Sequence, residues 1–164
     1  MSRDLGQARG DYLGYLAVER GSSPNTVEAY GRDLDRYVNH LASLGVTDPE
    51  KVTRKLVEAH VASLRDAGLA PSSVERALAA IKGFHRFMVN DQICTAFPTA
   101  TIPLPNTAQT LPDTISHEQV AALLDQSFAL TFAGQRDHAI LETLYGCGLR
   151  ASELCGLDLS ELAL

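Results

Sequence analysis

The clearest hydrophobic pattern in the sequence is a single apolar stripe between residues 23 and 44. Its members recur at steps of three and four residues, the spacing of one face of an α-helix: Val27, Tyr30, Leu34, Val38, Leu41 and Leu44. Ser23 is a favourable N-cap residue, Pro24 suits the first helical position, and Gly45 suits the end of a helix. The pattern predicts an amphipathic helix over this stretch.

Similar patterns predict three more helices in the first half of the chain, over about residues 4–20, 53–67 and 72–90. No window shows the sustained alternation of a half-buried strand. Because the connections between these helices are short, residues 1–91 are expected to fold as a compact four-helix domain, and the chain as a whole is expected to be all-α.

A proline-rich stretch separates this part from the rest of the chain. Four of the seven prolines fall in "FPTATIPLPNTAQTLPDT", residues 97–114. Proline lacks a backbone donor and breaks helices. Residues 92–114 are therefore predicted to be a linker, followed by a second, smaller part over 115–164.

The second part begins with a helix start signal. Ser116 and Gln119 have the spacing of a capping box, and Ile115 and Val120 hold the two positions of a hydrophobic staple. A helix to about Gln126 is expected. A second, over about 135–145, is expected to bury Ala139, Ile140, Leu141 and Leu144, and a third starts near Arg150.

Composition narrows the class of protein. An apolar content of 45% and a mean hydropathy of −0.04 in 164 residues are typical of a globular protein. No apolar run is long enough for a membrane span, and the first residues lack a secretory signal. Three scattered cysteines then indicate reduced thiols, so we expect a cytoplasmic location without a membrane partner.

The net charge of −6 is unevenly distributed. Residues 1–91 hold 12 Lys+Arg and 12 Asp+Glu, whereas residues 92–164 hold 2 and 8. Any binding to phosphate must therefore use a local basic face. Arg76, Lys82 and Arg86 share one side of the helix at 72–90, opposite its apolar side. They could follow a nucleic-acid backbone, or they could be the solvated face of an amphipathic helix.

Metal and common catalytic motifs are not found. "HEQVA", residues 117–121, has Ala121 where a zinc-protease helix needs its second histidine, and no cysteine pair has a metal-ligand spacing. His85 is expected to be a half-buried helix residue. We expect no metal and no cofactor.

"GLRASEL", residues 148–154, places Arg150 at a helix start, where the helix dipole disfavours a cation. Arg150 and Glu153 could be a surface i,i+3 pair, although the order of acid and base is the less favourable one. Alternatively, a guanidinium held by a carboxylate could stabilise the charge of a phosphoryl-transfer transition state.

At this point the sequence resembles a known family. "RDHAILETLYGCGLRASELCGLDLSEL" (136–162) closely resembles the first catalytic-arginine segment of the tyrosine recombinases, or phage integrases, and especially of the Xer type. "SPNTVEAYGRDLDRYVNHL" (23–41) and "GLAPSSVERALAAIKGFHRFMV" (68–89) are similar to the core-binding domain. "LPDTISHEQVAALL" (111–124) resembles the entry to the catalytic domain.

The resemblance implies a four-helix, SAM-like core-binding domain at 1–91 and the first helices of a truncated catalytic domain at 115–164. It implies double-stranded DNA as substrate, four protomers on it, and strand cutting and rejoining through a 3′-phosphotyrosyl link without metal or ATP. Arg150 would contact the scissile phosphate and Glu153 would orient it. Arg76, Lys82 and Arg86 would contact DNA, and Thr26 and Ser73 are weaker candidates for contacts to the DNA backbone.

None of the tyrosines follows an H-x-x-R motif, so none can be assigned as nucleophile, and the chain is expected to bind DNA without cleaving it. In the family the chain would serve chromosome dimer resolution and segregation. The alternatives are a mobile-element integrase, a non-catalytic helical DNA-binding module, or a protein-interaction module that is a partner or inhibitor of a recombinase.

Overall fold

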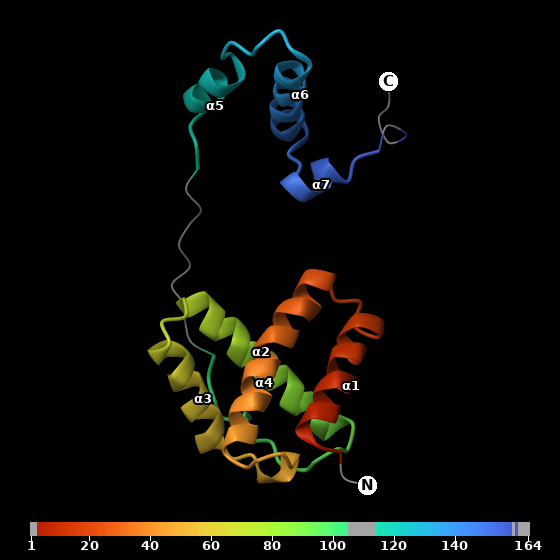
Figure 1. The fold of residues 1–164 in the computed structure, drawn as a ribbon, viewed down its shortest axis with the longest axis vertical. Helices are drawn as coiled ribbons and strands as arrows, with labels where there is room; N and C mark the ends of the chain where they lie inside the picture. Colours follow the sequence, from red (N-terminus) through yellow and green to blue (C-terminus); the bar gives the residue numbers. More distant parts are fainter. Residues whose placement is uncertain (1–2, 105–113, 159, 161–164) are drawn as a thin grey trace. The chain divides into compact units, whose positions relative to one another are not determined.

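The computed structural model describes residues 3–104, 114–158 and 160, and in these ranges every regular element is a helix (Figure 1). The chain divides into two compact units, Met1–Gln109 and Thr110–Leu164. The all-α prediction is confirmed. Residues 105–113 of the predicted linker lie outside the described residues.

The first unit is a four-helix bundle whose helices are close to those that the sequence predicted. They are α1 (Leu5–Val18), α2 (Pro24–Ser43), α3 (Arg54–Asp66) and α4 (Pro71–Asn90), with a short 3₁₀ helix, η1 (Pro49–Lys51), before α3. α2 and α4 pack against each other as the central pair, and α1 and α3 each pack against both of them (Figure 1). The unit is thus built around the α2–α4 pair.

Side chains at the helix starts explain where these helices begin. Asp4 and Gln7 form a capping box at α1, and Ser23 and Thr53 accept hydrogen bonds from the backbone N–H groups of Thr26 and Leu56. Ala70 makes no side-chain cap at α4, where Pro71 instead occupies the first turn. The predicted Ser23–Pro24 start of α2 is confirmed.

One glycine of α4 lets α1 approach closely. A Cβ at position 83 would overlap the phenol oxygen of Tyr12, which is 4% exposed. The Tyr12 ring packs against Phe84 and Phe87 with centroid separations of 5.8 and 5.4 Å. Gly83 therefore makes room for the aromatic contact between α1 and α4.

The centre of the bundle contains polar side chains as well as apolar ones. Asp33, His60 and His85 are at most 2% exposed, and Tyr37 is fully buried. The Tyr37 hydroxyl lies 2.9 Å from Nε2 of His85. The prediction of a half-buried His85 was wrong, because His85 faces the α2–α4 contact and is completely enclosed.

The segment that follows α4 packs back onto the bundle. Cys94, Thr99 and Ile102 are buried although the sequence placed them in the linker. The Glu50 carboxylate accepts hydrogen bonds from the backbone N–H groups of Thr95 and Ala96, at 2.7 and 3.2 Å. Residues 94–102, here termed the strap, therefore lie on the four-helix unit.

The second unit contains α5 (His117–Leu124), α6 (Phe132–Cys147) and α7 (Ala151–Cys155), and the predicted Ser116–Gln119 capping box is present. Its apolar side chains are far less covered than expected. Val120 is buried, but its proposed staple partner Ile115 is 65% exposed. The prediction that α6 buries four residues was wrong: Ile140, Leu141 and Leu144 are half-buried and Ala139 is exposed.

Candidate nucleic-acid interface

The three basic residues of α4 have three different environments. The Arg76 guanidinium donates to the buried carboxylate of Asp33 through Nε at 2.8 Å and Nη2 at 3.3 Å. The Lys82 ammonium donates to the backbone carbonyl of Ile102 in the strap. Arg86 is exposed and makes no hydrogen bond or ion pair within the described ranges. Of the three, only Arg86 therefore has none of its donors engaged in the described ranges.

The Arg76–Asp33 pair joins α4 to α2. Asp33 is 1% exposed, whereas Arg76 remains 42% exposed. The hydrogen bond from Asp33 raises the pKa of Arg76 above its ordinary value. A buried carboxylate needs such a partner, since an unpaired charge in a protein interior is costly. Arg76 thus stabilises the bundle.

Arg86 lines a cavity of about 380 Å³ between α1, the start of α2 and the second half of α4. Arg20, Thr26, Tyr12 and Tyr30 also line it. Burial, and secondarily the neighbouring Tyr30, raises the pKa of Tyr12 to about 12, so its hydroxyl stays protonated as a donor. The cavity therefore brings two guanidinium groups together with phenol hydroxyls. The carboxylates of Glu19 and Asp91 also line it, and Asp91 is paired with Arg3. Arg20 and Arg86 are the groups of this cavity that could bind an anion.

Thr26 and Ser73 lie in the first turns of α2 and α4. The Thr26 hydroxyl is 2.9 Å from the hydroxyl of Ser23, which is the N-cap residue of α2. Ser73 is half-buried and stands 13 residues before Arg86, about 20 Å along the helix axis at 1.5 Å per residue. The structure therefore brings Thr26 to Arg86 and keeps Ser73 apart from them.

Sequence reasoning missed Arg20 as a partner of Arg86. Arg20 follows the C-terminus of α1, outside any helical face that periodicity could have defined. Its neighbour Gly21 has φ +57°, a left-handed conformation that glycine adopts easily and that ends the helix there. No pattern in the sequence relates this turn to the end of α4.

In the second unit, Arg150 is the N-cap residue of α7 and Glu153 stands in its first turn. The Glu153 carboxylate accepts the backbone N–H of Arg150 at 2.7 Å and its Nη1 at 3.0 Å. These two bonds, the backbone one first, lower the pKa of Glu153. The Arg150 side chain is 83% exposed. Glu153 therefore offsets the unfavourable position of the cation and holds the guanidinium at the surface.

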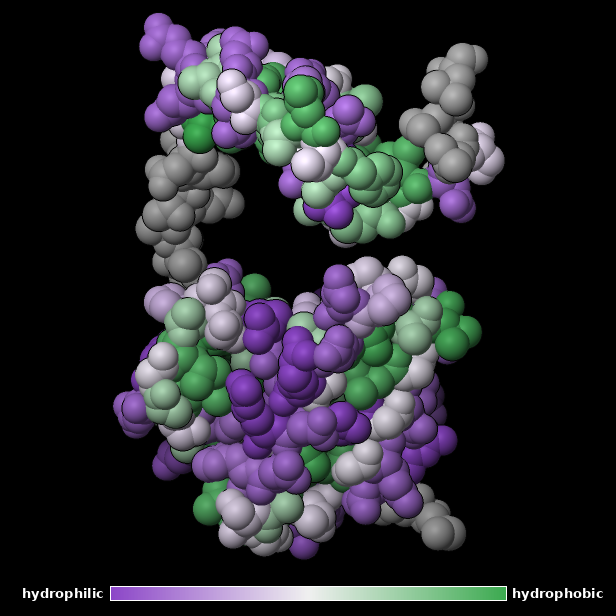
Figure 2. Space-filling model, turned by 45° about the horizontal axis from the view of Figure 1, so that its top comes forward, coloured by the Kyte–Doolittle hydropathy of each residue, from purple (hydrophilic) through white to green (hydrophobic). Residues whose placement is uncertain are grey.

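Hydrophilic side chains gather on one face of the four-helix unit (Figure 2).

Within the described ranges, no three His, Cys, Asp or Glu side chains are grouped so that they could hold a metal ion. No helix there is both long enough and apolar enough to cross a membrane.

Comparisons with known proteins identify the family. The model of the phage integrase N-terminal SAM-like domain matches residues 10–92, which is more than half of the chain. The chain therefore belongs to the phage integrase, or tyrosine recombinase, family.

Curated relatives place it near the Xer type. The chain is 36% identical over 154 residues to the tyrosine recombinase XerD of Halalkalibacterium halodurans, covering 93% of this chain and 52% of that protein. It is 37% identical to XerD of Listeria innocua (94% and 52%) and 36% identical to XerD of Bifidobacterium longum (93% and 51%). The chain thus spans about half the length of these relatives.

A solved structure, titled "Crystal structure of XerA recombinase", aligns over 96% of this chain and 52% of that one, with 20% identity and a TM-score of 0.49.

Proposed function

We propose that this chain is the DNA-binding part, with the first helices of the catalytic part, of a Xer-type site-specific recombinase. The whole enzyme would cut and rejoin DNA strands through a 3′-phosphotyrosyl intermediate and act in chromosome dimer resolution in the cytoplasm. Similarity to XerD proteins over both units supports this proposal, since it extends across 93% of the chain.

The four-helix unit is proposed to bind double-stranded DNA through the Arg86 cavity. The observation that carries this proposal is that two guanidinium groups without ion-pair partners in the described ranges, Arg20 and Arg86, line one cavity beside Thr26. A guanidinium matches the non-bridging oxygens of a phosphate. Ser73 would contact the backbone elsewhere along α4. Arg76 contributes indirectly by holding α4 to α2.

Arg150 is proposed to contact the scissile phosphate, with Glu153 as the residue that orients it. The exposed guanidinium is held on one side only, by a carboxylate three residues on, and its other donors face solvent. That arrangement is what a phosphate-binding arginine requires. Completing the reaction needs a tyrosine nucleophile, a lysine and an H-x-x-R motif, together with further protomers on the DNA.

The test is a fluorescence-anisotropy titration of a short double-stranded DNA at several salt concentrations. Each phosphate contact contributes about 0.9 to the slope of log K against log salt. Arg86→Glu should weaken binding and reduce this slope by about 1, because one contact is lost. Arg65→Glu, an exposed arginine of α3 outside the Arg86 cavity, is the matched control. An equal loss of DNA affinity and of salt slope in both variants would contradict the proposal that DNA binds at the Arg86 cavity.

A second candidate function is a protein-interaction module. Leu130 and Phe132 of the second unit are 97% and 85% exposed, and large exposed apolar side chains are typical of protein contacts. No DNA binding at low salt, together with self-association that Leu130→Ser abolishes, would favour this function over DNA binding.

A further inference from the structure

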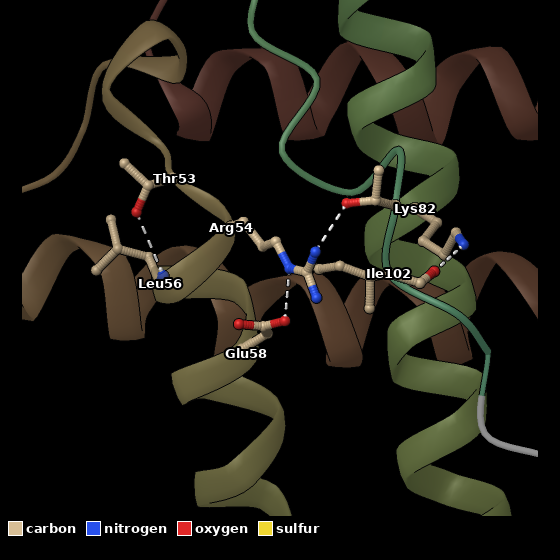
Figure 3. A network of polar contacts seen from close by, with 7 residues as sticks. Thr53, Arg54, Leu56, Glu58, Lys82 and Ile102 are labelled. Atoms are coloured by element: carbon tan, nitrogen blue, oxygen red, sulfur yellow. Dashed lines mark hydrogen bonds and ion pairs between the residues drawn. The ribbon is translucent and has the colours of Figure 1, made fainter.

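Three polar side chains of the four-helix unit, Glu50, Arg54 and Lys82, hold the strap. At its start, Glu50 accepts the N–H groups of Thr95 and Ala96. Near its end, Arg54 Nη1 donates to the Thr101 hydroxyl at 3.0 Å, and Lys82 donates to the next carbonyl, that of Ile102 (Figure 3). α3 and α4 therefore each supply one cation to the last two residues of the strap.

The arginine that holds Thr101 is itself held in place. Arg54 Nε donates to the Glu58 carboxylate one turn further along α3, at 2.7 Å, which leaves its Nη1 directed at the strap (Figure 3). Arg54 comes directly after Thr53, whose hydroxyl caps α3. The guanidinium is thus fixed to the first turn of a helix, as a positioning group requires.

Apolar packing at the end of the strap is incomplete. Ile102 is 7% exposed, but a cavity of about 260 Å³ lies beside it, lined by Val61, Leu78 and Pro103 among others. Leu104 remains 47% exposed. Because this hollow is open, the side chains beside it lack apolar neighbours on one side, and the contacts from Arg54 and Lys82 add to the apolar burial of Ile102.

We propose that Lys82 and Arg54 are positioning residues that latch the strap, so that the connection to the second unit leaves the four-helix unit at a fixed point, next to Pro103. Lys82 then serves the strap, and DNA is contacted by Arg86. The family model ends at residue 92, so the strap extends the DNA-binding unit beyond it. The part of this proposal that concerns DNA rests on the proposed function.

The environments of Lys82 and Arg86 support this division. The Lys82 ammonium uses one of its donors in the hydrogen bond to a backbone carbonyl. Removing the ammonium leaves that carbonyl without its charged partner. Lys82 is half-buried beneath the strap, whereas Arg86, one turn further along α4, is exposed. A phosphate can therefore reach Arg86 without moving the strap, whereas Lys82 would have to leave Ile102.

The test combines hydrogen exchange and DNA titration on the intact chain with four variants. Lys82→Met removes the ammonium and keeps the stem, Lys82→Arg keeps a donor, Thr101→Val removes the hydroxyl that Arg54 contacts, and Arg86→Met removes the proposed DNA contact. The reporters are the amides of Ala100 and Ile102, which donate to the carbonyls of Phe97 and Thr99 within the strap.

Lys82→Met and Thr101→Val should lower the protection of both amides by about tenfold, the effect of losing one hydrogen bond of this kind. Neither should change the salt slope of DNA binding, and Lys82→Arg should restore the protection. Arg86→Met should do the opposite, keeping strap protection and lowering the slope by about 0.9.

The proposal is overturned if Lys82→Met lowers the salt slope as Arg86→Met does, or if it leaves strap protection unchanged. If the unaltered protein does not bind DNA, the proposed function fails. The exchange measurements then still decide whether Lys82 and Arg54 latch the strap.

Discussion

The Tyr37 hydroxyl and Nε2 of His85 lie 2.9 Å apart in the centre of the four-helix unit, and neither side chain is exposed to solvent. His60 packs beside Tyr37 with a centroid separation of 5.2 Å, and both of its ring nitrogens lack a hydrogen-bond partner. Two of the five histidines are therefore enclosed as neutral rings in the core. Burial is the main cause that lowers the pKa of each to about 4.

The two buried histidines, His60 and His85, predict that the bundle loses stability in mild acid. In the unfolded chain both histidines bind a proton near pH 6.5, whereas in the folded unit they do so only near pH 4. The unfolded state thus binds more protons in this window. The contribution of the two neutral rings to the free energy of unfolding is fully present above pH 6.5. It falls as the pH drops towards 4, by up to about 2.7 kcal/mol per pH unit for two groups. Native-state hydrogen exchange of α2 and α4 amides measures this loss.

Substitution separates the contribution of His60. His60→Leu should halve the pH slope, because it removes one of the two buried rings that take up a proton on unfolding. Leucine loses no hydrogen bond there, since neither nitrogen of the His60 ring has a partner. His117→Asn, at the exposed start of α5, is the control and should leave the slope unchanged. A pH-independent stability of the unaltered protein between about pH 6 and about pH 4.5 would contradict the neutral buried rings.

The Arg76–Asp33 pair should contribute more to stability than an ordinary surface ion pair, although the Arg76 side chain is partly exposed. Arg76→Met leaves the buried Asp33 carboxylate unpaired and should cost about 2–3 kcal/mol of the free energy of unfolding. Arg32→Met breaks the exposed pair with Glu28 and should cost about 0.5 kcal/mol or less. Urea unfolding monitored by hydrogen exchange of α2 compares them.

The double variant Arg76→Met with Asp33→Leu provides the check on mechanism. Replacing both partners removes the unpaired charge, so most of the lost stability should return. If the double variant is as unstable as Arg76→Met, the loss comes from packing and the role given to the ion pair is wrong.

Gly83 should not tolerate a methyl group while Tyr12 keeps its hydroxyl. Gly83→Ala places a Cβ onto the phenol oxygen and should cost about 1–3 kcal/mol despite the better helix propensity of alanine. Tyr12→Phe in the same chain removes that oxygen and should relieve most of the cost. Gly10→Ala, where no atom lies within 4 Å of the new Cβ, should instead stabilise α1 by about 0.5–1 kcal/mol. Destabilisation at position 10 as large as at 83 would refute the steric account.

The second unit should respond differently to substitution. α6 has no buried residue, and Phe132 at its start is 85% exposed. Phe132→Ser should therefore change the free energy of unfolding of the second unit by about 0.5 kcal/mol or less. Phe84→Ala, in the core of the four-helix unit, should lower that unit's free energy of unfolding by about 3–5 kcal/mol. Amides of α6 should also exchange faster than those of α4. Equal protection in a monomer would show that the second unit is better packed than its exposed side chains indicate.

The sequence predicted the helices well because their signals are local. The stripe from Val27 to Leu44, the Ser23 cap and the Ser116–Gln119 capping box lie within a few residues of the elements that they define. Periodicity also separated the apolar from the polar side of α4. What it could not predict is which partner each polar residue meets, since Asp33 and Arg76 are 43 residues apart in the sequence.

The same limit explains the wrong predictions. His85 lies at the edge of the apolar side of α4, and only the packing of α2 shows that this edge is enclosed. Apolar spacing in α6 predicted burial, but burial needs a covering element, and the described part of the second unit covers Ile140 and Leu144 only in part. The Arg150–Glu153 contact was predictable because it spans three residues, whereas the shared cavity of Arg20 and Arg86 was not.

The most direct test of the proposed DNA-binding surface is hydrogen exchange of the intact chain with and without a short double-stranded DNA. We predict DNA-dependent protection at the start of α2 around Thr26 and in the second half of α4 around Arg86, with α3 unchanged. Protection confined to α3, or affinity for DNA without protection in α2 and α4, would contradict the account.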